Sequence, residues 1–148
     1  MLVRQAWLSL AEAGDVTWIA VVVMTDHVHA LFTLGLRLGF SQVVGKAKAS
    51  VTRSFGPSVG RIWQENLFEH RLRAGEETES YGFYVFMNPY VAGLADPGQP
   101  WSGWACSDET RLRFLSGRSA GGAPAPGWLD RASQPDPRLV VRSPRTNL

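Results

Sequence analysis

The spacing of apolar and polar residues predicts three helices along the first two thirds of the chain. Residues 2–13 place apolar side chains on one helix face, and Gly14 supplies a natural stop. A longer helix should begin at Ser41, a good N-cap. Its apolar positions recur every three or four residues before Gly56: Phe40, Val44, Ala47, Val51 and Phe55. A third helix should start at the acidic stretch 76–79 and run to about Met87 or Asn88, where Pro89 should end or kink it.

Other segments have the pattern of β-strands. The apolar stretches Thr17 to Met24 and His27 to Phe32 are joined by only Thr25-Asp26, so they form either an antiparallel hairpin or one long strand kinked at Asp26. We favour the single bent strand, because two linking residues without Gly or Asn make a poor hairpin turn. Residues 67–73 alternate as in a half-buried strand, where His70 is better explained as a hydrogen-bonded residue at the edge of the core than as a metal ligand.

Composition indicates one globular domain with a distinct tail. The 148 residues, 45% of them hydrophobic and 19% charged, suit a single core. The longest apolar run has seven residues against the ~20 that span a bilayer, and no targeting segment is visible, so we expect a cytoplasmic protein without a membrane partner. One cysteine excludes an internal disulfide and a multi-cysteine zinc site. We place the domain at 1–115 and an irregular Pro/Gly/Arg-rich tail at 116–148.

Positive charge is concentrated in the middle third of the chain. Between 41 and 75 six basic residues face two acidic ones: Lys46, Lys48, Arg53, Arg61, Arg71 and Arg73. This surplus favours an anionic partner, although a merely solvated surface would also carry it. Lys46 and Arg53 lie seven positions apart and therefore share a side of the predicted helix, as phosphate contacts would require. Trp63 beyond it is better explained as core than as a base-stacking residue. The tail, with seven Arg and two Asp after position 110, can add loose DNA contacts.

Two histidines one residue apart form the first candidate site. In a strand, side chains two positions apart share a face and are roughly 6.6 Å apart at the backbone, so His27 and His29 can hold one divalent ion. By itself this pattern is weak. It gains weight from the third predicted helix, where Tyr84 and Asn88 lie four positions apart, about 40° around the axis, and can face the same point.

Together these residues suggest a phosphoryl-transfer site. A metal held by the histidines would withdraw charge from a phosphate while the tyrosine oxygen attacks phosphorus, and Asn88 could supply the third protein ligand. The structural alternative is that Tyr84 merely packs this helix together with Phe83 and Phe86.

Three segments in order resemble the REP-associated tyrosine transposases, a family of single-tyrosine transposases in which two histidines flank a hydrophobic residue. They are Met24 to Phe32, Ile62 to Arg73 and Tyr84 to Leu94. The resemblance implies an α+β fold, with a ferredoxin-like antiparallel sheet and helices packed on one side. It also implies Mg²⁺- or Mn²⁺-dependent cleavage of single-stranded DNA beside a hairpin, which leaves a 5′-phosphotyrosine and a free 3′-hydroxyl. On this basis His27, His29 and Asn88 hold the metal, and Tyr84 is the nucleophile.

The chain departs from the family pattern in two places. Family members usually open with a strand before the first helix, whereas this chain begins almost directly with the helix, so we expect a sheet that lacks that strand. The family's Met-Pro-Asn-His is here Met24-Thr25-Asp26-His27, in which Asp26 can still make similar contacts around the ligands.

We therefore expect a transposase-like nickase and strand-transferase, associated with the nucleoid as a monomer or homodimer. The main alternative is a catalytically silent DNA-hairpin-binding protein. A His-x-His metalloprotein unrelated to DNA is disfavoured, because it leaves Tyr84, Asn88 and the basic helix without roles.

Overall fold

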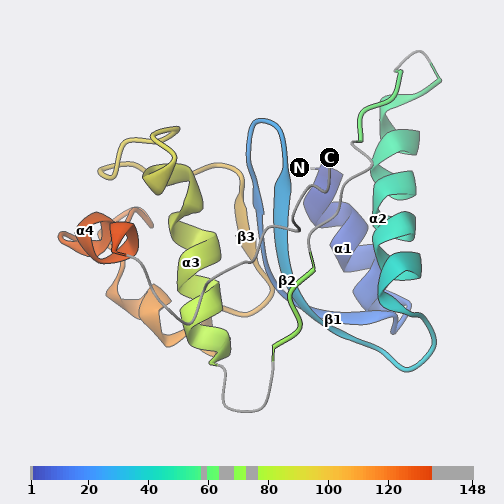
Figure 1. Ribbon diagram of the computed structural model, residues 1–148, viewed down its shortest axis with the longest axis horizontal. Helices are drawn as coiled ribbons and strands as arrows, with labels where there is room; N and C mark the ends of the chain where they lie inside the picture. Colours follow the sequence, from blue (N-terminus) through green and yellow to red (C-terminus); the bar gives the residue numbers. More distant parts are fainter. Residues whose placement is uncertain (1, 58–59, 64–68, 73–76, 135–148) are drawn as a thin grey trace, which may run out of the picture.

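The computed structural model describes residues 2–57, 60–63, 69–72 and 77–134 (Figure 1). Their order along the chain is α1 (Leu2–Glu12), β1 (Val16–Val23), β2 (Val28–Leu34), α2 (Phe40–Phe55), α3 (Thr78–Val91), β3 (Trp104–Cys106) and α4 (Trp128–Ser133), with two short 3-10 helices between β3 and α4. The strands form an antiparallel sheet in the order β2-β1-β3. The predicted α+β class and antiparallel sheet are therefore confirmed.

The first two strands form a hairpin, and the preference for one bent strand was wrong. Val23 pairs with Val28, and the Met24 N–H donates to the His27 carbonyl at 2.9 Å across Thr25 and Asp26. Among the described residues only glycines have positive φ, so this turn forms without the left-handed residue that the prediction required. Seven paired positions along β1 and β2 outweigh the poor turn sequence.

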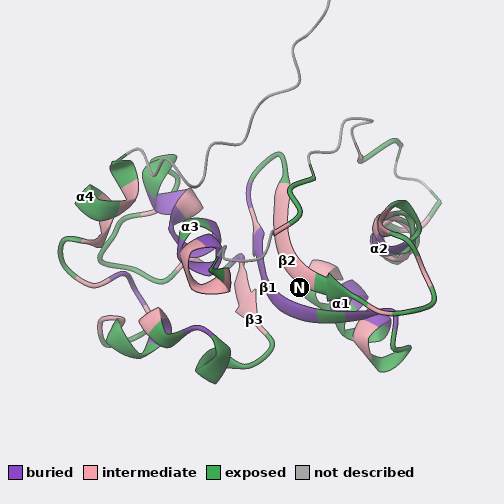
Figure 2. Cartoon of the chain, turned by 60° about the horizontal axis from the view of Figure 1, so that its bottom comes forward, coloured by how far each residue is buried: buried purple, intermediate pink, exposed green. Residues whose placement is uncertain are grey.

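Neighbouring residues of β1 contribute to different apolar clusters. Val21 packs with Trp7 of α1 and Val43 of α2, whereas Ala20 packs with Phe86 of α3. Because successive side chains of a strand point to opposite faces, the sheet is covered by α1 and α2 on one side and meets α3 on the other (Figure 2). The predicted layer of helices packed on one side is thus confirmed, and α3 adds a second core.

Helices α1 and α2 follow their predicted apolar faces with small differences at the ends. The N-cap of α2 is Gly39 rather than Ser41, because the Gln42 side chain accepts a hydrogen bond from the Gly39 N–H at 2.9 Å. Val43, Ala47 and Val51 are buried on α2, whereas Phe55, expected on this face, is 51% exposed.

Helix α3 begins close to its predicted start but continues through Pro89 to Val91. Pro89 lacks an N–H, and its ring crowds the carbonyl four residues earlier, but only two helical residues follow it, so both costs fall in the last turn. The predicted end at Met87 or Asn88 was therefore too early by three to four residues.

The segment after α3 is more structured than its composition indicated. β3 pairs with β1, and α4 packs against α3, where Trp128 contacts Phe83 edge-to-face with ring centroids 5.4 Å apart. Residues 135–148 of the predicted tail lie outside the described part of the chain. No strand is present at 69–72, and the remainder of the strand predicted at 67–73 lies outside the described residues.

None of the helices in the described ranges is long and apolar enough to cross a membrane.

Candidate metal and tyrosine site

The two histidines lie at the tip of the β1–β2 hairpin. His29 pairs with Val22 across the hairpin, while His27 occupies the turn that precedes β2. Val22 packs with Val85 of α3, which places His29 on the side of the sheet that meets α3. The two Nε2 atoms are 3.0 Å apart, and the ring planes are 79° from one another. The predicted convergence of the imidazoles is present, although one of them comes from a turn.

Asp26 completes a short polar chain at this tip. Its Oδ1 atom lies 2.6 Å from His27 Nδ1, and this hydrogen bond holds the pKa of the Asp26 carboxyl below its usual value. The His27 side chain is 50% exposed and that of Asp26 is 74% exposed, so solvent reaches both groups. The carboxylate therefore contacts the ring nitrogen of His27 that points away from His29.

His29 is the more sheltered of the two histidines. Burial lowers its pKa from 6.5 to about 4, and the charge on His27 contributes further in the same direction. The imidazole is consequently neutral near pH 7, which is the form that binds metal ions. Two nitrogens this close are suited to a shared divalent ion, so the pair fits two of the ligands that the resemblance implies.

Tyr84 is positioned next to His29. Its ring approaches the imidazole edge-on, with centroids 5.9 Å apart and planes at 83°. Tyr84 is 36% exposed, although Phe83 and Val85 on either side of it are buried. Its hydroxyl makes no hydrogen bond to any residue in the described ranges. The packing alternative therefore explains Phe83 and Phe86, which form the core, better than it explains Tyr84.

Asn88 lies one turn further along α3, half-buried. Its Nδ2 atom donates to the Tyr84 carbonyl at 3.4 Å, so the amide is held against its own helix. Within the described part of the chain no group of three or more His, Cys, Asp or Glu side chains is arranged to hold a metal. The two imidazoles thus fit a metal, whereas the role of Asn88 as third ligand stays a prediction.

The hydroxyls of the other two tyrosines of α3 make contacts within the protein. The Tyr81 hydroxyl lies 2.7 Å from His70 Nε2, with the two rings stacked at 5.1 Å, as expected for a hydrogen-bonded His70. The hydroxyl of Tyr90 donates to the Gln99 carbonyl at 3.1 Å and accepts from the Trp101 N–H at 2.8 Å. Burial raises the pKa of Tyr90, which disfavours its phenolate. Tyr84 is therefore the tyrosine of α3 whose hydroxyl has no partner among the described residues, and its role as nucleophile stays a prediction.

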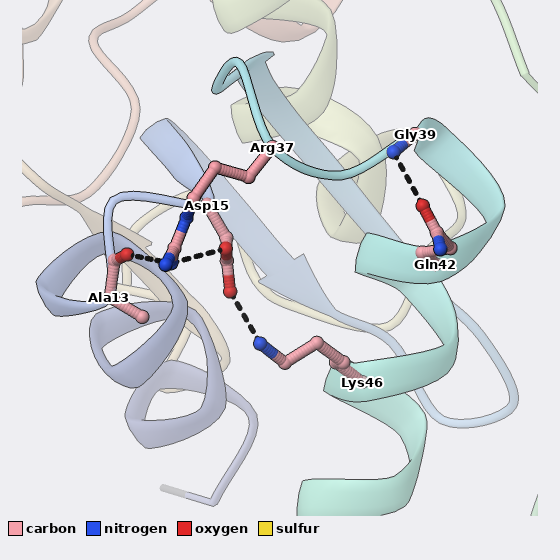
Figure 3. Close-up of polar contacts among 6 residues, drawn as sticks. All are labelled: Ala13, Asp15, Arg37, Gly39, Gln42 and Lys46. Carbon is pink, nitrogen blue, oxygen red and sulfur yellow. Dashed lines mark hydrogen bonds and ion pairs between the residues drawn. The ribbon is translucent and has the colours of Figure 1, made fainter.

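Lys46, expected to contact phosphates, makes an ion pair with a buried carboxylate. Its ammonium lies 2.5 Å from Oδ2 of Asp15, whose side chain is only 1% exposed (Figure 3). Arg37 binds the other carboxylate oxygen at 2.9 Å and also donates to the Ala13 carbonyl. Lys46 thus has a structural role, and its contact with DNA stays a prediction.

The importance of Asp15 was missed from sequence. The available signal was an acidic residue directly after Gly14, at the start of an apolar strand where a charge needs a partner.

The remaining basic residues differ in their surroundings. Lys48 lies over the Trp63 ring at 5.7 Å, and the Trp63 indole donates to the Lys48 carbonyl at 3.0 Å. Arg53 and Arg61 are exposed. Arg71 pairs with Glu69 at 2.5 Å, and Arg73 lies outside the described residues. Trp63 therefore packs on α2 beside exposed positive charge.

Comparisons with known proteins give little further information. No known protein family's sequence profile matches the chain. No solved structure matches it. A Na⁺/H⁺ antiporter NhaA from Arthrobacter sp. (strain FB24) is 31% identical over 110 residues, which are 74% of this chain and 22% of that protein. The chain thus spans about a fifth of the relative that it matches, and this similarity assigns no family.

Proposed function

We propose that this protein is a transposase-like endonuclease and strand-transferase of the REP-associated tyrosine transposase type. It cleaves single-stranded DNA next to a hairpin formed by a REP-type palindrome. The observation that carries the proposal is the contact of the Tyr84 ring with His29, whose Nε2 atom lies 3.0 Å from that of His27. A tyrosine hydroxyl without a partner among the described residues, beside two converging imidazoles, suits transfer of a phosphoryl group.

In the proposed reaction the Tyr84 oxygen forms a bond to phosphorus as the bond to the 3′ oxygen breaks. The phenol proton passes to solvent, which reaches this half-exposed residue, and the departing 3′ oxygen takes up a proton. The products are a 5′-phosphotyrosine and a free 3′-hydroxyl, and attack by another 3′-hydroxyl completes strand transfer. His27, His29 and the predicted ligand Asn88 would hold Mg²⁺ or Mn²⁺, which supplies withdrawal of charge from the phosphate.

Binding of the DNA backbone is assigned to the basic residues predicted from the sequence other than Lys46, whose ammonium is bound to Asp15. Arg53 and Arg61 are exposed, and Lys48 of α2 lies over the Trp63 ring. Such a surface can bind phosphates without reading base sequence, so hairpin choice must come from other contacts. We place the protein at the nucleoid, as a monomer or a homodimer.

A catalytically silent DNA-hairpin-binding protein is the second candidate. It is favoured by the small ligand set, because no group of three or more His, Cys, Asp or Glu side chains in the described ranges is arranged to hold a metal. With two protein ligands instead of three, a divalent ion would be held weakly. Such a protein would keep the basic surface and lack the covalent step.

A covalent-adduct assay separates these candidates. Wild-type protein and Tyr84→Phe are incubated with labelled single-stranded hairpin DNA and Mn²⁺, then resolved on a denaturing gel. We expect an adduct with wild type and none with Tyr84→Phe, which loses one oxygen and keeps the packing ring.

Tyr81→Phe and Tyr90→Phe are the matched controls and should still form the adduct, once circular dichroism has verified that each variant folds. An adduct that persists in Tyr84→Phe overturns the assignment of the nucleophile. DNA binding without an adduct in any of the four proteins favours the silent binding protein.

A further inference from the structure

We infer that Asp26 is a positioning residue that fixes the proton of His27 on Nδ1 and so directs the Nε2 lone pair of His27 toward His29. The inference rests on the metal site of the proposed function and gives Asp26, expected from the sequence to make contacts around the ligands, a defined effect on the protons of that site. It starts from two contacts that join three side chains: Asp26 Oδ1 lies 2.6 Å from His27 Nδ1, and His27 Nε2 lies 3.0 Å from His29 Nε2.

The proton positions follow from the chemistry of these groups. An ionised carboxylate only accepts hydrogen bonds, so the short contact with Asp26 requires a proton on His27 Nδ1. A neutral imidazole then has its lone pair on Nε2, which faces His29. The 3.0 Å contact in turn requires a donor, so in the metal-free protein His29 carries its proton on Nε2. Asp26 thus sets the tautomers of both rings.

With these proton positions, the Nε2 atom of His27 can bind a metal at once, whereas the Nε2 atom of His29 cannot. His27 already presents a lone pair at the point between the rings, because Asp26 holds its other nitrogen protonated. His29 must move its proton to Nδ1 before its Nε2 can bind an ion. Without Asp26 both rings would have to adopt the binding tautomer, which lowers the population of the competent state and hence the affinity.

The magnitude is limited by exposure of the pair. Loss of a group that orients a metal-ligating histidine typically lowers affinity by 10–100-fold, and the exposed Asp26 should be near the lower end, about tenfold. An Asn at this position keeps an acceptor oxygen for the His27 Nδ1 proton but no charge. Asp26→Asn should therefore preserve the tautomer and lose less affinity than Asp26→Ala.

Long-range ¹H–¹⁵N NMR on metal-free protein at pH 8 measures the tautomers directly. We expect the Nδ1–H form of His27 in wild type, Asp26→Asn and the control Thr25→Ala, a neighbouring exposed change in the same turn. Asp26→Ala should shift His27 toward the Nε2–H form. An unchanged His27 tautomer in Asp26→Ala overturns the inference.

Calorimetric titration with Mn²⁺ alone supplies the second measurement. About tenfold weaker binding is expected for Asp26→Ala, a smaller loss for Asp26→Asn and none for Thr25→Ala. Equal affinity of Asp26→Ala and wild type contradicts the inference. Neither measurement uses DNA, so a protein with the expected tautomers and affinities but no DNA adduct would retain the positioning role and lose the proposed function.

Discussion

Asp15 and Lys46 join the turn after α1 to helix α2 through a contact of 2.5 Å between carboxylate and ammonium. The two residues are 31 positions apart in sequence, and the carboxylate is 1% exposed. Loss of Lys46 would leave this buried carboxylate with Arg37 as its one remaining cation, which costs more than loss of an ion pair that is exposed on both sides. This contact therefore matters chiefly for the stability of the layer formed by α1 and α2.

The first prediction concerns how the contribution of Asp15 to stability changes with pH. The hydrogen bond from Lys46, with help from Arg37, lowers the pKa of Asp15 below its ordinary value of 3.8. A carboxyl with a lowered folded-state pKa contributes stability above the unfolded value and loses it as the pH falls through the folded value. We expect Asp15→Asn to be less stable than wild type at pH 7, with the difference shrinking below pH ~4. Urea denaturation at both pH values measures this.

The matched control for Asp15 is Asp108→Asn, because that exposed carboxylate is bonded only within its own segment, to Thr110 at 2.9 Å and 2.7 Å. Its effect should be smaller at pH 7. A difference between wild type and Asp15→Asn that stays constant from pH 7 to pH 3 would contradict the role assigned to the Asp15 charge.

The second prediction is that Gly→Ala substitutions at two positions change the stability of the fold in opposite directions. Gly45 is exposed inside α2, and a Cβ there would have nothing within 4 Å, so Gly45→Ala should stabilise the protein. The gain should be about 0.5–1 kcal/mol. At Gly35 a Cβ would lie 2.3 Å from the Gly14 carbonyl oxygen, which belongs to the backbone and cannot rotate away. Gly35→Ala should therefore destabilise the fold, as midpoints of urea denaturation will show.

Residue patterns predicted the helices well because their apolar faces are local. Ala47 and Val51 are buried on the predicted face of α2, and Trp7 and Leu10 on that of α1. The hairpin was missed because its deciding feature is the pairing of two strands, whereas the prediction considered only turn preference. β3 has three residues and exists only because it pairs with β1, so no pattern of its own could reveal it.

The candidate site divides in the same way. The convergence of His27 and His29 was predictable from their spacing, and their proximity to Tyr84 from the resemblance to a transposase family. The hydrogen bond of Tyr81 to His70 and the ion pair of Lys46 with Asp15 join residues 11 and 31 positions apart. Such contacts depend on how the elements pack, which the sequence pattern does not encode.

The third prediction concerns the choice of metal. Two imidazole nitrogens favour Mn²⁺ over Mg²⁺, which prefers oxygen ligands and retains its waters. We expect calorimetry to show tighter binding of Mn²⁺ than of Mg²⁺, and loss of Mn²⁺ binding in the His27→Ala, His29→Ala double variant. His70→Ala is the control that removes an imidazole outside the site, because His70 contacts Tyr81 instead. Equal Mn²⁺ affinity in wild type and the double variant would eliminate the site.

The last prediction separates structural from DNA-binding charge on α2. Arg53 is exposed near the C-terminal end of α2, whereas the ammonium of Lys46 is bound to Asp15. Each phosphate contact on single-stranded DNA adds about 0.7 to the slope of log affinity against log salt. Arg53→Gln should therefore weaken binding to all sequences alike and lower that slope by about 0.7. Lys46→Gln should leave the slope unchanged while it lowers the urea midpoint, because it removes a partner of buried Asp15. Fluorescence anisotropy with a labelled hairpin at several salt concentrations gives both slopes.

If the slope falls for Lys46→Gln and not for Arg53→Gln, Lys46 exchanges Asp15 for phosphate when DNA binds, and Arg53 belongs to a solvated surface.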